Sequence, residues 1–297
     1  MLLKEWCLKY IEDYKSISLK KSTYDSYIRY CDHINLQVDI STITLSDIQS
    51  IITKMHAQDL TRSTINHTLT IIRQALNKAY MLGMTKHIIN YKLLELPRAS
   101  SELVQALSEE EVKAILNGPY CHYKDIFCFL LLTGLRIGEA IALQIKDIDL
   151  KNKMLYVRNT DYEGELQKNK SNRSRAVPVT PMIEKIIFRH LHINKNTRLF
   201  LNRNDKPCIY STVRDAFYRY CDSIKINRYG LHALRHSFAT LSIRAGGNIK
   251  AVSQILGHAD VGITLKIYTD ISPEQKRQAV TALEASLTEA GGLALTR

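Results

Sequence analysis

Apolar side chains recur at helical spacing through the first 95 residues, with no strand-like segment between them. The spacing predicts four short helices: one over about residues 6–14, one from Thr23 to Ile34, one from a cap at Ser46-Asp47 to about Gln58, and one from Thr61 to Gly83. The last helix carries a regular apolar face of Ile65, Leu69, Ile72, Leu76 and Ala79. Four helices without strands favour a compact bundle.

Residues 95–107 break this rhythm with Pro97 and a pair of serines, which predicts an interdomain linker. Ser108 and Glu111 then have the spacing of a capping box and predict the first helix of a second domain. A chain of 297 residues has room for about two domains. We therefore expect domains at 1–95 and 108–297, joined by a linker at 96–107.

The second domain is predicted to be mainly α with a small β-hairpin. Strand-like segments at Lys153–Asn159 and Arg175–Val179 would pair across a long polar tip, and a short strand is expected at Leu199–Leu201. Helices are expected at 124–132, 137–143, 211–223, 232–245, 248–256 and 261–269, with a terminal helix from about residue 272.

The charge balance favours a polyanionic partner. The chain has 41 Lys and Arg against 29 Asp and Glu, a formal net charge of +12. Such an excess suits nucleic acid or an anionic membrane surface, although a basic surface without a dedicated partner fits the charge alone equally well.

The six cysteines show neither a Cys-x-x-Cys pair nor a zinc-type Cys/His spacing, so they are expected to be thiols in a reducing compartment. The N-terminus does not resemble a signal peptide, and no apolar run approaches the ~20 residues of a membrane span. These features predict a cytoplasmic protein.

Four short motifs carry the candidate chemistry. They are Thr-Gly-Leu-Arg-Ile-Gly-Glu at 133–139, Leu-His-Ala-Leu-Arg-His at 231–236, Leu-Gly-His at 256–258 and Ile-Tyr-Thr-Asp at 267–270. Taken singly, each fits an ordinary turn, a solvated helix end, a loop histidine or a core tyrosine. His232 and Arg235 lie three residues apart and would share one helix face.

The ordered set Arg136, His232, Arg235, His258 and Tyr268 resembles the tyrosine recombinase family of phage and transposon integrases and Xer-type recombinases. The text at 137–149 and 236–240 is similar to the family's continuation of its two arginine boxes, and 62–69 is similar to its core-binding domain. The resemblance covers about residues 5–285. It implies an N-terminal four-helix core-binding (SAM-like) bundle and a catalytic domain that together form a C-shaped clamp on DNA.

The resemblance implies a role for each residue. Tyr268 would attack phosphorus, while Arg136 and Arg235 would hold the non-bridging oxygens, since guanidinium groups bind them bidentately and stay charged. His232 is the candidate for proton transfer at the tyrosine oxygen, whose unperturbed pKa is near 10. His258 would donate a hydrogen bond to the phosphate. Glu139 either stands behind Arg136 or is an ordinary helix residue.

The leaving sugar oxygen needs an acid, and a lysine of the hairpin tip suits that role. Lys170 stands where the family's lysine usually falls, and Lys168 is the alternative. Arg173 and Arg175 would, with Lys168, contact DNA phosphates.

The implied reaction is a pair of transesterifications through a 3′-phosphotyrosyl link, which needs no metal and no nucleotide cofactor. The implied partners are duplex recombination sites and the protein itself as a tetramer on two of them, with room for an accessory DNA-bending or directionality protein. Integration or excision of a mobile element is the expected role. Xer-like multimer resolution, a type IB topoisomerase-like activity and a catalytically silent DNA-binding regulator remain alternatives.

Two structural questions stay open at this point. The tail helix would dock either on its own protomer or on a neighbour. The chain starts at the core-binding bundle, so an arm-binding domain is expected to be either naturally absent or removed.

Overall fold

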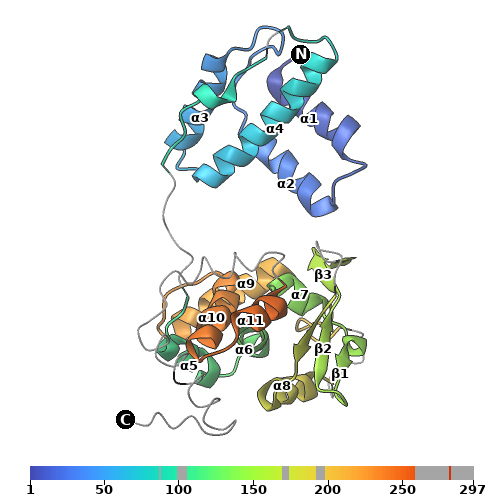
Figure 1. Ribbon diagram of the computed structural model, residues 1–297, viewed down its shortest axis with the longest axis vertical. Helices are drawn as coiled ribbons and strands as arrows, with labels where there is room; N and C mark the ends of the chain where they lie inside the picture. Colours follow the sequence, from blue (N-terminus) through green and yellow to red (C-terminus); the bar gives the residue numbers. More distant parts are fainter. Residues whose placement is uncertain (87, 99–105, 169–173, 192–197, 258–280, 282–297) are drawn as a thin grey trace, which may run out of the picture. The chain divides into compact units, whose positions relative to one another are not determined.

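A computed structural model describes residues 1–86, 88–98, 106–168, 174–191, 198–257 and 281. The chain divides into two compact units, Met1–Leu103 and Val104–Arg297 (Figure 1). The division falls inside the segment 96–107, where a linker is expected. Among the described residues, no helix combines the length and apolar character that crossing a bilayer requires.

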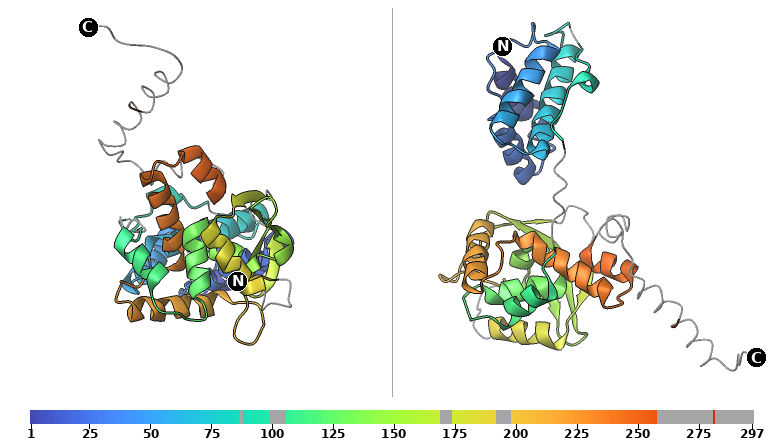
Figure 2. Two further views of the ribbon diagram at one scale, coloured as in Figure 1. Left: turned by 90° about the horizontal axis from the view of Figure 1, so that it is seen from below. Right: turned by 90° about the vertical axis from the view of Figure 1, so that its left-hand side faces the viewer.

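The described part of the first unit is a bundle of four α helices that pack side by side (Figures 1 and 2). They are α1 (Leu3–Tyr10), α2 (Lys21–Cys31), α3 (Leu45–Ala57) and α4 (Arg62–Met81), with a π-helical turn at Ile11–Lys15 after α1 and a 3-10 turn at Tyr91–Leu93. All five predicted apolar residues of α4 are buried. The Trp6 indole N–H donates to the Ala75 carbonyl oxygen at 2.7 Å and ties α1 to α4.

The start of α3 differs from the predicted cap at Ser46-Asp47. Thr44 is the N-cap, because its hydroxyl accepts from the Asp47 backbone N–H at 3.3 Å while the Asp47 carboxylate accepts from the Thr44 backbone N–H at 2.8 Å. This reciprocal pair is a capping box, and Ser46 is the second residue of the helix.

The helices of the second unit surround α6 (Lys124–Thr133), whose apolar residues are buried on nearly every side. The predicted capping box of Ser108 and Glu111 is confirmed at the start of α5 (Glu109–Asn117). The other described helices are α7 (Ile137–Ala142), α8 (Pro181–Leu191), α9 (Tyr210–Ser223), α10 (Leu231–Arg244) and α11 (Ile249–Leu256), with a 3-10 turn at Ile145–Asp147. The mainly α prediction is therefore confirmed.

The predicted hairpin is confirmed as part of a three-stranded antiparallel sheet, β1 (Ile148–Asp149), β2 (Met154–Val157) and β5 (Arg175–Pro178), in the order β1-β2-β5. The described part of its tip is not the long loop that was expected. Residues 159–168 form a second hairpin, β3 (Asn159–Tyr162) with β4 (Glu165–Lys168), around a turn in which Glu163 and Gly164 have positive φ. Two residues in this conformation favour a tight hairpin turn.

Two more features of this unit differ from the sequence-based expectations. Helix α8 was not predicted; it begins at Pro181 and buries Ile183, Ile186 and Ile187 at helical spacing. No regular strand forms over 199–201, where only isolated bridges join Arg198 to Gln144 and Leu201 to Pro207. The helices expected at 261–269 and from about 272 lie outside the described residues.

Candidate active site

Arg136 stands at the end of a tight turn between α6 and α7. Gly134 makes this turn with φ +65, and a Cβ there would come within 2.4 Å of the Phe238 ring, so both backbone and packing require glycine. The Arg136 side chain is 45% exposed, and its Nη1 donates to Glu139 Oε1 at 3.1 Å. The Arg136 backbone N–H donates to the same carboxylate, to Oε2 at 2.9 Å. The turn thus presents a fixed but accessible guanidinium group.

Arg235 lies in the first turns of α10 and is only 3% exposed. Its Nη1 donates to the Gly134 carbonyl oxygen at 2.8 Å and its Nη2 to the Leu256 carbonyl oxygen at 2.7 Å. Burial, followed by the charge of Arg136, lowers the pKa of Arg235 to about 9, so the group stays charged at neutral pH. A charged side chain held by neutral oxygens is well suited to bind an anion.

His232 lies one turn before Arg235, and its side chain is exposed. Partial desolvation and then the charges of Arg235 and Arg136 lower the pKa of His232 below its ordinary value of 6.5. The imidazole is therefore neutral at neutral pH and can accept a proton.

Glu139 is 4% exposed and joins two arginines. Arg175 donates to it bidentately, from Nη1 to Oε1 at 2.9 Å and from Nη2 to Oε2 at 2.6 Å. Burial raises the pKa of Glu139, but the hydrogen bonds and charge of Arg175, with those of Arg136, outweigh it and hold the pKa below its usual value. These contacts favour the view that Glu139 stands behind Arg136.

Arg175 differs from the accessible phosphate contact that the sequence suggested. Its side chain is 12% exposed, and its Nε also donates to the Ile255 carbonyl oxygen at 2.5 Å. The sequence signal for such a role is weak, because a basic residue in a polar hairpin tip has the same appearance whether it faces solvent or the protein.

The structure therefore brings Arg136, His232 and Arg235 close enough to influence one another's charge, and Arg235 also contacts the end of α11. Lys168 ends β4, is exposed, and borders a hollow of about 540 Å³ with Lys146 and Arg158. The predicted residues Lys170, Arg173, His258 and Tyr268 lie outside the described residues. The described segment 198–257 ends at Gly257, which directly precedes His258 in the sequence.

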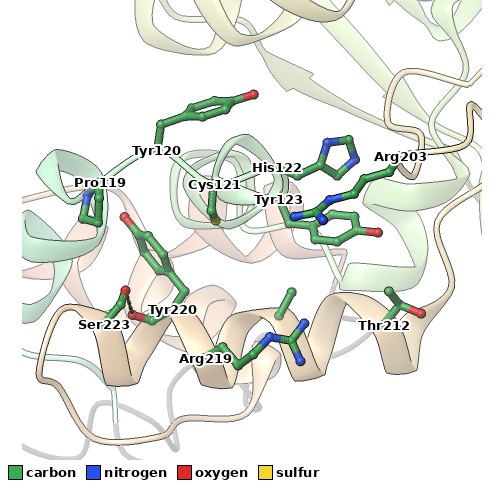
Figure 3. A pocket seen from close by; sticks show the side chains of 11 residues that line it. Pro119, Tyr120, Cys121, His122, Tyr123, Arg203, Thr212, Arg219, Tyr220 and Ser223 are labelled. Carbon is green, nitrogen blue, oxygen red and sulfur yellow. Dashed lines mark hydrogen bonds between the residues drawn. The ribbon is translucent and has the colours of Figure 1, made fainter.

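A second hollow, of about 620 Å³, lies at the opposite end of α6 from the Arg136 turn. Figure 3 shows Tyr120, His122 and Tyr123 on one side of it and Arg219 of α9 on the other. None of the predicted site residues that the structure describes lines it. In the part of the chain that the structure describes, no three His, Cys, Asp or Glu side chains gather as metal ligands, and all six cysteines are free thiols.

Comparisons with known proteins place the chain in a family. Residues 103–275 match the Phage integrase family. The chain is 27% identical over 298 residues to a XerC-like tyrosine recombinase of Caldanaerobacter subterraneus subsp. tengcongensis, which covers 88% of this chain and 75% of that protein. It is 30% identical over 207 residues to the tyrosine recombinase XerA of Pyrococcus horikoshii, covering 67% of this chain and 68% of that one.

Solved structures show the same fold. The Tn1549 transposon integrase in complex with a circular intermediate DNA superposes with a TM-score of 0.81 at 22% identity, over 95% of this chain and 99% of that one. A lambda integrase dimer bound to a COC′ core site superposes with a TM-score of 0.73 at 17% identity, over 92% of this chain and 97% of that one. The family match covers more than half of the sequence, and the chain therefore belongs to the Phage integrase family and is a tyrosine site-specific recombinase.

Proposed function

We propose that this recombinase cuts and rejoins DNA by transesterification, with Tyr268 as the nucleophile and Arg136 and Arg235 as the groups that hold the scissile phosphate. The observation that carries the proposal is the buried charge of Arg235, which its described contacts place against two carbonyl oxygens. Arg136 and Arg175 pair with Glu139 while Arg235 pairs with no carboxylate in its described contacts, so the described part of the site has an excess of positive charge.

The chemistry of the phosphate requires such an excess. Attack at phosphorus builds negative charge on the non-bridging oxygens, and donors that are already fixed stabilise this charge without reorganisation. The two described hydrogen bonds of Arg235 use two of its five N–H donors. The remaining donors, with those of Arg136, suit the bidentate binding of phosphate oxygens.

The lowered pKa of His232 supports one of the proposed proton transfers, and the family resemblance supplies the others. Neutral His232 takes the phenol proton of Tyr268, and His258 donates a hydrogen bond to the phosphate. Lys170, or alternatively Lys168, protonates the leaving 5′ oxygen. The tyrosyl ester that forms has an energy similar to the phosphodiester that breaks, so the reaction needs no nucleotide cofactor.

The partners and the role are extended from the relatives. The Tn1549 and lambda integrase structures hold DNA, and one is a lambda integrase tetramer bound to a Holliday junction. By analogy, residues 1–95 bind the core of a recombination site, the domain from 108 carries out the chemistry, and four protomers act on two sites in the cytoplasm. Integration or excision of a mobile element fits the integrases, whereas the Xer relatives keep multimer resolution as the alternative.

The test begins by finding the site. Cells that express the full chain are lysed in detergent, covalent protein–DNA adducts are captured, and the attached DNA is sequenced. A nicked duplex with that sequence then traps the adduct, because the short cleaved strand diffuses away. The native chain is expected to form the adduct and the Tyr268→Phe variant to form none.

Each alternative has its own outcome. If the Tyr268→Phe variant forms as much adduct as the native chain, Tyr268 is not the nucleophile. Binding of the sequence by the native chain without an adduct would favour a silent regulator. Nicking and closing without the joining of two separate sites would favour a topoisomerase-like enzyme.

A further inference from the structure

Arg175 joins three segments that are far apart in the sequence. It begins β5, pairs in register with Val157 of β2, and stands five residues after Lys170. Its guanidinium group holds both oxygens of Glu139, which in turn holds the side chain and backbone N–H of Arg136. Its Nε reaches the Ile255 carbonyl oxygen near the end of α11.

The end of α11 is held by two arginines in succession. The last carbonyl groups of a helix lack partners within the helix, and cations near them are favourable. Here Arg175 satisfies the carbonyl of Ile255, and Arg235 satisfies that of Leu256. Gly257 then turns the chain with φ +68, and a Cβ on it would lie 3.0–3.2 Å from side-chain atoms of Arg175. Glycine therefore allows the guanidinium group to lie against the turn that precedes His258.

We propose that Arg175 is a positioning residue that locks the start of β5, the turn that carries Arg136 and the end of α11 into one arrangement around the phosphate. The inference rests on the proposed function, since it concerns the geometry of that site. The planar guanidinium group makes three directed hydrogen bonds to two segments at once. A lysine in its place has one point-like charge, so it cannot reproduce the fork on Glu139 together with the contact to Ile255.

A direct phosphate contact is the competing role for Arg175, and the two roles predict different measurements. Loss of a phosphate contact weakens DNA binding and reduces its salt dependence. Loss of a positioning contact leaves binding nearly intact and slows the chemical step, because small displacements of reacting groups cost up to about 100-fold in rate.

The experiment compares Arg175→Lys with Arg189→Lys as a matched control. Arg189 also holds a buried carboxylate bidentately, that of Asp125, through Nε at 3.0 Å and Nη2 at 2.6 Å, but in a contact between α8 and α6 away from the site. The rate of single-turnover cleavage is measured on the nicked duplex at saturating DNA. The affinity for DNA is measured separately by fluorescence anisotropy. We expect Arg175→Lys to cleave about 10- to 100-fold more slowly with affinity changed less than about threefold, and Arg189→Lys to cleave as the native chain does.

Hydrogen exchange supplies a readout that does not depend on catalysis. In Arg175→Lys, amides of 134–142 and 249–257 are expected to exchange at least about tenfold faster, while those of α9 keep the native rate. Unchanged exchange in both segments would overturn the inference, as would reduced DNA affinity with an unchanged cleavage rate. Suppose that Arg175→Lys exchanges faster in both segments but the native chain forms no adduct with DNA. That result would support the positioning role of Arg175 and would count only against the proposed function.

Discussion

Arg235 donates a 2.8 Å hydrogen bond to the carbonyl oxygen of Gly134, two residues before Arg136. One candidate phosphate ligand is thereby fastened to the turn that presents the other. The arrangement joins the end of α6 to the start of α10, and the close approach of Phe238 to Gly134 reinforces the same contact. The relative position of the two guanidinium groups is therefore determined by the packing of these two helices.

Arg235→Lys is expected to lower the single-turnover cleavage rate by about 100-fold or more, because removing one donor from a charge-stabilising site costs about 10²–10³. Lysine keeps a positive charge but cannot reach the carbonyl oxygens of Gly134 and Leu256 and a phosphate together. The measurement is adduct formation at saturating DNA. A rate within a few-fold of native would show that charge alone suffices at this position.

Gly134→Ala is expected to destabilise the second unit by about 2–4 kcal/mol, the sum of backbone strain at positive φ and overpacking against Phe238. At about 2–4 °C per kcal/mol, thermal melting detects this change readily.

Gly246→Ala is the matched control for this change. Gly246 also has positive φ, at +86, but a Cβ there meets nothing within 4 Å. The Gly246→Ala variant is expected to lose only the stability that backbone strain costs, about 1–2 kcal/mol in the free energy of unfolding. Equal melting temperatures for the two variants would mean that the Phe238 ring moves aside without cost.

The sequence predicts helices with a strong apolar face well and exposed hairpins poorly. The α4 face and the Ser108 capping box were predicted because each has a regular spacing. The hairpin at 159–168 was missed because its strands are mostly exposed or half-buried, so they need no alternation of apolar residues. The helix α8 was missed because Pro181 suits both the end of a strand and the first turn of a helix.

The site shows a similar limit. The motifs point to Arg136, His232 and Arg235 because their order resembles that of the tyrosine recombinase family and their residue types suit phosphate chemistry. The motifs do not distinguish an arginine that faces DNA from one that faces the protein. The described contacts of Arg175 are all with the protein, to Glu139 and Ile255. That difference depends on the distance between β5 and the end of α11, which local spacing does not encode.

The pH dependence of cleavage should reflect His232. Because the pKa of His232 is lowered in the folded chain, its neutral form persists somewhat below pH 6.5, and the rate should fall only as pH drops through that lowered value. Protonating His232 costs more free energy in the folded chain than in the unfolded one, so the fold is at its most stable above the unfolded pKa of about 6.5 and loses stability as pH falls from there through the lowered folded pKa. His232→Gln should slow cleavage and remove this acidic limb from the rate profile. Persistence of the limb in the variant would assign it to another group.

Chelation of divalent metals should leave adduct formation unchanged. In the proposed mechanism two guanidinium groups, those of Arg136 and Arg235, would take the role that metal ions have in two-metal phosphoryl-transfer sites, and their charge does not depend on a dissociable ion. The measurement is the single-turnover rate on the trapped substrate in EDTA, with and without added Mg²⁺. A metal-requiring nuclease of the same substrate serves as the control that chelation is complete. Loss of the adduct in EDTA and its recovery with Mg²⁺ would show that the arginines do not neutralise the transition state by themselves.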